Sequence, residues 1–152
     1  MSDPVSFDSI CPRFALPLLY QGQSQKEAFV NETLTRLDAL LHCSVEGEAS
    51  APPLAPENGE NWIVGEDASG DWAGYDGALA CRQQDQWVFI TPRAGVRVFD
   101  VSSAQERFFD ESWKKADAVQ EPNGGSVVDS EARAAVTQLV SVLQVLGILP
   151  GA

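Results

Sequence analysis

The chain has 152 residues, of which 44% are hydrophobic and four are tryptophan. It is therefore long enough to form one domain with a packed core, and its composition is unlike that of a disordered chain. Its formal net charge is −12, and no Lys or Arg lies between Arg36 and Arg82. Because an acidic surface repels phosphate backbones and anionic lipid headgroups, we expect no nucleic-acid partner and no membrane partner.

The N-terminal region predicts an arm followed by a short extended segment. Residues 1–13 have neither the basic stretch nor the long apolar stretch of a secretion signal, so we expect an irregular arm on a protein made in the cytoplasm. Residues 14–20 form an apolar run interrupted by a proline, and residues 21–23 have the composition of a turn. Ser24 and Glu27 have the spacing of a capping box, which predicts that a helix begins there.

The first helix is predicted from a single apolar stripe at helical spacing. The stripe consists of Val30, Leu34, Leu37 and Leu41. We expect a helix of about 20 residues whose stripe packs on one face of a sheet.

The middle of the chain predicts an antiparallel β-meander. A proline-rich loop at residues 49–59 can be neither a helix nor a central strand. After it, short apolar runs alternate with glycines at a spacing typical of consecutive strands. The expected strands are Trp62–Val64, Ala78–Arg82, Gln86–Thr91, Val96–Val101 and Arg107–Phe109. A single sheet built from them places five side chains near the core, namely Trp62, Trp87, Phe89, Val98 and Phe108.

The C-terminal region predicts a linker and a second helix. Residues 117–128 include Gly124-Gly125 and read as a flexible connection. Asp129 or Ser130 can cap a helix that runs to about Leu146, with Gly147 just beyond its end. This apolar segment is too short and too polar on one side for a transmembrane helix.

The second helix is the candidate interface. Its polar side chains form a narrow stripe, so apolar side chains cover more than half of its circumference. Either the helix is buried within its own chain, or it is buried against neighbouring subunits or a partner. We favour the second interpretation because a small sheet can cover only part of such an apolar face. The interface residues expected from this pattern are Val136, Leu139, Val140, Leu143 and Leu146.

No pattern in the sequence indicates enzyme chemistry. The single histidine, His42, stands beside Cys43, but neighbouring side chains on a helix diverge and do not form a catalytic pair. The three cysteines, Cys11, Cys43 and Cys81, are widely spaced and are expected to be free thiols. The aspartates between residues 67 and 76 do not match a calcium loop, and no phosphate loop is present. We therefore expect no catalytic residues, no cofactor and no metal.

A turn rich in glycine and aromatic residues provides an alternative binding function. Trp72 and Tyr75 could stack on the apolar face of a sugar, and Asp76 could accept hydrogen bonds from its hydroxyl groups. The competing interpretation is that these aromatic side chains fill a small β core. A carbohydrate-binding module that contacts capsule polysaccharide is thus the second functional hypothesis.

The order of these segments resembles one known family. The resemblance covers residues 12–99, and it rests on LPLLYQGQSQKE at 16–27, NETLTRLDALL at 31–41, APPLAPENGENWIVG at 51–65, GDWAGYDG at 70–77 and WVFITPRAGVRVFD at 87–100. These runs are similar to a domain of unknown function carried by alphaproteobacterial phages, prophages and gene transfer agents. That family implies a structural component of a phage-like particle, not an enzyme, and it supplies no catalytic or ligand residues.

The resemblance also implies a position in the particle. Family members often continue into a long fibre, whereas this sequence ends at Ala152, so the expected role is a base or adaptor for a separate fibre chain. Its counterpart would be the head-spike base of a gene transfer agent, bound to a capsid vertex protein, and the alternative is a tail-side fibre adaptor. The expected location is the virion-like particle, after synthesis in the bacterial cytoplasm. We expect a homo-oligomer, in which a vertex favours five copies and a fibre favours three.

These expectations combine into one architecture. The fold class is α+β, with a small antiparallel β-meander, an N-terminal amphipathic helix packed on it and a C-terminal apolar helix. The expected divisions are a domain at residues 1–116, a linker at 117–128 and an oligomerisation helix at 129–152.

Overall fold

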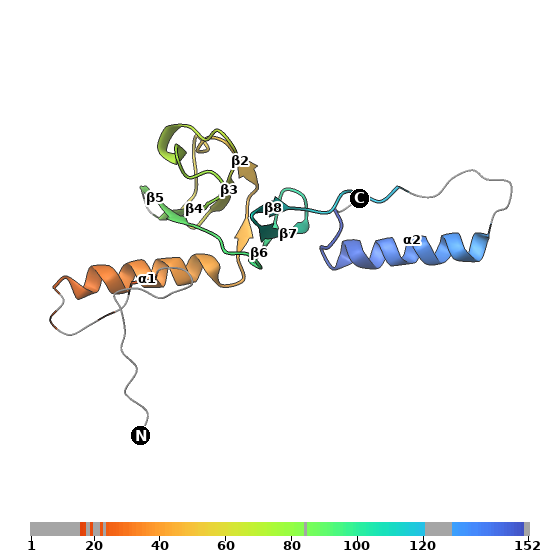
Figure 1. Cartoon of the computed structure of the whole chain (residues 1–152), viewed down its shortest axis with the longest axis horizontal. Coiled ribbons are helices and arrows are strands. Elements are labelled where there is room, and N and C mark those ends of the chain that lie inside the picture. Colours follow the sequence, from red (N-terminus) through yellow and green to blue (C-terminus); the bar gives the residue numbers. More distant parts are fainter. Residues whose placement is uncertain are drawn as a thin grey trace, which may run out of the picture.

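A computed structural model describes residues 16, 17, 19, 22, 24–83, 85–120 and 129–150. The predicted arm at residues 1–13, most of the apolar run at 14–20 and most of the linker lie outside these residues, so those predictions are not tested. Within the described ranges the chain forms two helices and eight short strands, which confirms the α+β class (Figure 1). The two helices lie at opposite ends of the molecule, with the strands between them (Figure 1).

The strands form two four-stranded sheets, where the sequence suggested one. The first sheet has the order β1-β6-β7-β8, with bounds Ser44–Val45, Arg97–Asp100, Gln105–Asp110 and Ser112–Lys114. The second has the order β2-β3-β4-β5, with bounds Glu48–Ala49, Asn61–Val64, Leu79–Gln83 and Gln86–Ile90. All five predicted strands are present within one or two residues of their expected bounds. The meander divides after β5 because the next segment contains Pro92, which lacks the N–H that a ladder requires.

The two sheets are built on the same plan. In each one, a two-residue strand pairs in parallel with the first strand of an antiparallel three-stranded meander. Both of these short strands come from one segment, residues 44–49, which passes from the first sheet to the second. Backbone bonds fix it on both sides, since Phe99 N–H donates to Cys43 O and Ile63 N–H donates to Gly47 O, each at 2.9 Å.

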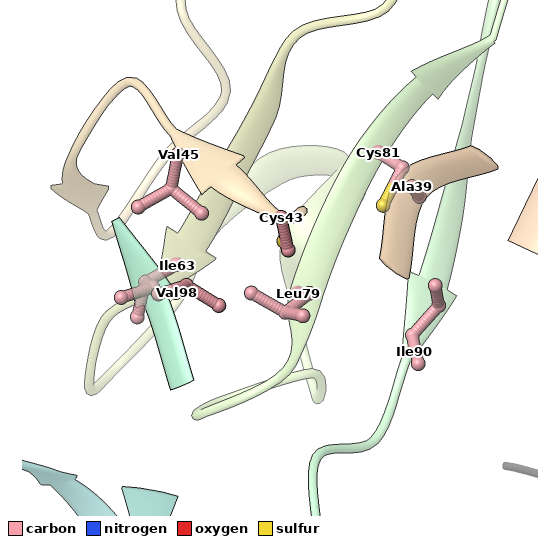
Figure 2. Packing of buried hydrophobic residues seen from close by; sticks show 8 residues of the cluster. All are labelled: Ala39, Cys43, Val45, Ile63, Leu79, Cys81, Ile90 and Val98. Carbon is pink, nitrogen blue, oxygen red and sulfur yellow. The ribbon is translucent and has the colours of Figure 1, made fainter. Parts of the chain in front are cut away.

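Two clusters of buried side chains form the core. The larger cluster joins the end of α1 (Lys26–Leu40) to both sheets, as Figure 2 shows, and contains Ala39, Cys43, Val45, Ile63, Leu79, Cys81, Ile90 and Val98. The smaller one is centred on Trp72, Val64 and Ala80. Of the five predicted core side chains, Val98 is buried in the larger cluster, and Trp62, Trp87 and Phe89 pack half-buried on the smaller one. The fifth, Phe108, is half-buried under the guanidinium of Arg97.

A buried ionic network also connects the two sheets. Arg107 on β7 bonds Asp100 on β6, with its Nε 2.7 Å from Oδ2, and its Nη1 lies 2.8 Å from Glu48 Oε2 on β2. Asp100 accepts further bonds from the Ser102 hydroxyl at 2.6 Å and the Ser103 N–H at 3.2 Å. Burial raises the pKa of Asp100, but these hydrogen bonds and the Arg107 charge outweigh burial and lower it below its ordinary value.

The first helix is present, but three details of its prediction are wrong. It has 15 residues and not about 20, because it ends at Leu40. The helix begins after Gln25, whose φ is 54°, and no side chain caps it, so the Ser24 capping box does not form. The predicted stripe also does not pack on a sheet, because Leu34, Leu37 and Leu41 are exposed. Of the residues of α1 only Ala39, in the last turn, is buried, and it is small enough to approach the core closely.

The second helix agrees closely with its prediction. It spans Ser130–Val145, and the Asp129 carboxylate caps it by accepting a bond from Ala132 N–H at 2.8 Å. Gly147 follows with a φ of 68°, the left-handed conformation expected just past a helix end. Neither this helix nor α1, as far as the structure describes the chain, has the length and apolar character needed to cross a membrane.

Candidate functional site

The helix α2 is attached to the rest of the protein by its C-terminal end. The N–H of Glu106 on β7 donates a hydrogen bond to Gly147 O, and Leu149 is buried. Gly147 also lies against an aromatic ring, since a Cβ added at this position would be 3.2 Å from Phe99 Cε2. The chain after α2 thus anchors on the first sheet, while the helix itself extends away from it (Figure 1).

None of the 16 residues of α2 is buried. Its half-buried side chains lie on one side of the helix and include two of the predicted interface residues, Val140 and Leu143. The other three, Val136, Leu139 and Leu146, are exposed, and Leu139 and Leu146 retain 60% of their accessible surface. The apolar arc of the helix and the side that faces its own chain therefore coincide only partly. The uncovered part of the arc is the candidate site, and we call it the α2 face.

An exposed aromatic residue of the first sheet lies near the C-terminal end of α2. Val142 is exposed, as Leu139 and Leu146 are, and Phe99, whose ring lies next to Gly147, is 42% exposed. Several exposed apolar side chains on one helix face mark an interaction site more often than an isolated exposed leucine does.

A second apolar surface lies on α1. Its three exposed leucines, Leu34, Leu37 and Leu41, lie on one side of the helix, and we call this surface the α1 stripe. The α1 stripe and the α2 face belong to opposite ends of the molecule (Figure 1), so within one chain neither can cover the other. The sequence identified the stripe but not its exposure, because spacing alone does not say which side of a helix meets the core.

The structure separates the three residues of the predicted glycan turn. Trp72 retains 0% of its accessible surface and packs edge-on against Trp87, so its ring has no face to offer a sugar. Asp76 is exposed, but its carboxylate accepts hydrogen bonds from the N–H groups of Asp67 and Ala68 at 3.2 and 3.1 Å and so holds its own turn. Tyr75 remains available at 45% exposure. The prediction that Trp72 contacts a ligand is therefore wrong, because the aromatic residue fills the core.

A cleft that sequence reasoning missed lies beside Tyr75. It has a volume of about 830 Å³ and is formed between α1 and the hairpin of β4 and β5. Its lining includes four polar side chains that carry no charge, Asn31, Thr35, Gln83 and Gln86. The two glutamines that flank the hairpin turn were the only indication of this cleft in the sequence. They form a cleft only because α1 lies next to β5, which the sequence does not show.

The residues considered for catalysis are not arranged for it. His42 is exposed just after the end of α1, whereas Cys43 is buried. Burial raises the pKa of Cys43 to about 11. Burial, with a further contribution from Cys43, also raises the pKa of Cys81 to about 12. Both are free thiols, as predicted, and both are protonated near neutral pH. Among the described residues, no three His, Cys, Asp or Glu side chains gather as metal ligands would.

A protein family matches the central part of this chain. The family described as protein of unknown function DUF2793 matches residues 30–114, which is more than half of the chain. The chain belongs to the DUF2793 family. The DUF2793 match covers most of α1 and all eight strands and ends before α2, so the α2 face lies outside the matched residues. No curated protein matches the chain.

Proposed function

We propose that this DUF2793 protein is a non-enzymatic structural component of a phage-like particle and that it self-associates through the α2 face. The observation that carries self-association is an apolar helix face that is exposed among the described residues, with Phe99 of the first sheet also exposed near its end. Removing apolar surface from water contributes about 25 cal/mol per Å², so an uncharged face of this kind favours burial against another subunit.

The placement of the two apolar helix surfaces favours a particular geometry. Because the α2 face and the α1 stripe lie at opposite ends of the molecule, contact between the α2 face of one copy and the α1 stripe of the next is heterologous. Heterologous contacts close into a ring when the rotation between copies is a simple fraction of a full turn. We infer a ring of identical chains, with five copies favoured at a capsid vertex and three favoured below a fibre.

The resemblance to phage and gene-transfer-agent domains supports the remaining parts of the proposal. In this role the protein is the base of a head spike or fibre, bound to a capsid vertex protein on one side and to a separate fibre chain on the other. Electron microscopy of particles from strains with and without the protein tests this position. Density that is lost from the capsid vertices supports the head-spike base, and density lost from the tail supports the tail-side adaptor instead.

Self-association is tested by placing charge on the α2 face. Leu139→Asp with Val142→Asp changes two exposed side chains, so the fold is expected to survive, whereas buried unpaired charge makes the interface unfavourable. Multi-angle light scattering at tens of micromolar should show an oligomer for the wild type and a folded monomer for the variant. Leu143 is left unchanged because it is half-buried against its own chain.

The matched control places the same two charges on the polar side of the helix. Thr137→Asp with Ser141→Asp also changes exposed residues of α2, and it should leave the oligomer intact. A monomeric wild type at the same concentration would contradict the proposal. So would a control variant that dissociates as completely as the Leu139 and Val142 variant does.

A further inference from the structure

The cleft between α1 and the β4–β5 hairpin is electrically neutral, in contrast to the protein as a whole. Of the described residues that line it, only Glu32 and Arg36 carry a charge, and they form an ion pair at 3.0 Å. The whole chain has a net charge of −12. A neutral cleft on such a surface has no excess charge with which to hold either an anion or a cation, so its chemistry is suited to an uncharged ligand.

The polar groups of the cleft can both donate and accept hydrogen bonds. Asn31 and Thr35 come from α1, and Gln83 and Gln86 flank the turn of the facing hairpin. Each amide side chain offers two N–H donors and a carbonyl acceptor, and the threonine hydroxyl does both. A sugar hydroxyl also donates and accepts, so this set of groups matches a ligand with many hydroxyl groups.

One wall of the cleft is a flat aromatic surface. Tyr75 stacks on Phe89 with ring centroids 3.6 Å apart and an interplanar angle of 5°. Phe89 covers one face of the Tyr75 ring, and because the residue is 45% exposed, the other face is the one that can receive a ligand. The adjacent Trp87 is held in place by Trp72, at 5.1 Å between ring centroids, and by the Arg82 guanidinium, 5.3 Å from the Trp87 ring.

We propose that this cleft binds an uncharged saccharide. The exposed face of Tyr75 packs on the apolar face of a sugar ring, and the amides of Asn31, Gln83 and Gln86 bond its hydroxyl groups. A volume of about 830 Å³ is within the usual range for small-molecule sites. This site goes beyond the proposed structural role.

An extended peptide added to the edge strand β5 is the competing occupant. Arg36 argues against it, because its Nη1 already donates a bond to Phe89 O at 3.2 Å on this strand. An added strand would have to displace this guanidinium from a contact that also orders the end of α1. The neutral amides and the aromatic wall need no such rearrangement to receive a sugar.

The test uses the full chain and a panel of hexasaccharides. Neutral hexasaccharides of glucose, mannose, galactose and N-acetylglucosamine are compared with polygalacturonate and with a pool of extended hexapeptides at about 1 mM by saturation-transfer NMR. At least one neutral saccharide is expected to bind, and its affinity is then measured by titration. Binding by none of the neutral saccharides would overturn the proposal, and so would stronger binding of polygalacturonate or of the peptides.

Variants then locate the bound saccharide. Tyr75→Ala should weaken binding about tenfold, while Tyr75→Phe, which keeps the ring, should retain most of it. Gln86→Ala changes an exposed side chain and should weaken binding about threefold with the fold unaffected. The matched control is Leu54→Ala, a fully exposed apolar residue outside the cleft, which should bind as the wild type does. Equal losses in Tyr75→Ala and Leu54→Ala, or no loss in Tyr75→Ala and Gln86→Ala, would overturn this location.

Discussion

The two sheets and the helix α2 are both rich in apolar residues, yet they use them differently. In the sheets, Val45, Leu79 and Ile90 are almost completely removed from water, whereas α2 has no buried residue at all. Isolated helices of this length are marginally stable in water, so α2 depends on its Asp129 cap and on the anchor after Gly147. The apolar side chains of the sheets therefore stabilise the fold, whereas those of α2 stay exposed, which is what the proposed self-association requires.

The largest expected effect comes from removing the cation that connects the sheets. Arg107→Ala leaves the buried Asp100 and its partner Glu48 without a counter-charge, and breaking such a pair costs about 3–5 kcal/mol. The free energy of unfolding, measured by urea denaturation, should fall by that amount. The matched control is Arg97→Ala in the same sheet, because Arg97 is 61% exposed and its pair with Glu106 is worth at most about 1 kcal/mol. Equal losses for the two variants would show that the network does not hold the sheets together.

A smaller loss of stability is expected at alkaline pH, where the buried thiols of Cys43 and Cys81 lose their protons. The folded-state pKa of Cys43 is about 11 and that of Cys81 about 12, both above the ordinary value of 9.0. A raised acid pKa means that the folded state favours the protonated thiol. Its stabilising contribution is complete below pH 9 and is lost as the pH rises towards 11 and 12. At pH 11 the free energy of unfolding should fall by about 2 kcal/mol for Cys43 alone.

The control for this titration removes both thiols. Cys43→Ala with Cys81→Ala should be less stable at neutral pH because of lost packing, but its stability should decline less steeply between pH 9 and pH 11. Chemical denaturation at each pH measures both curves. Parallel curves would mean that other groups, and not these cysteines, cause the alkaline loss.

The smallest effect is expected at the junction of the two regions. Gly147→Ala places a Cβ at positive φ and 3.2 Å from the Phe99 ring, which should cost about 1 kcal/mol or somewhat more. Because only the anchor is affected, hydrogen exchange should speed up in α2 while the strands keep their protection.

Gly74→Ala provides the comparison for this junction. Gly74 also has a positive φ, of 84°, but nothing lies within 4 Å of its added Cβ, so it should show the backbone penalty without any effect on α2. If hydrogen exchange in α2 is unchanged by Gly147→Ala, the anchor does not hold the helix.

Local signals in the sequence predicted the elements better than their packing. The Asp129 cap, the end of α2 at Gly147 and all five strands follow from short-range chemistry, and the structure contains them. The strands β1 and β2 escaped prediction because two residues carry no periodicity. The division into two sheets followed from those strands and from Pro92, so it could not be anticipated either.

The functional surfaces were harder to predict than the elements, because they depend on how distant segments pack together. The α1 stripe was correctly found at helical spacing, but only the docked helix shows that Ala39, and not Leu34 or Leu37, meets the core. Trp72 lies in a turn with the composition of a ligand-binding turn, but its side chain is fully buried. The neutral cleft requires two segments far apart in the sequence, α1 and the β4–β5 hairpin, to be adjacent.

The segment at residues 44–49, which supplies a strand to each sheet, has a consequence for how the chain folds. The second sheet can close as soon as β5 has been synthesised, but Ser44 must wait for Phe99 before the first sheet can form. Non-local pairings of this kind slow folding, because a long loop must lose conformational entropy before the contacts that stabilise it can form. Until then the backbone groups of β1 have no ladder partner, so we expect the pairing of β1 with β6 to be among the later steps of folding.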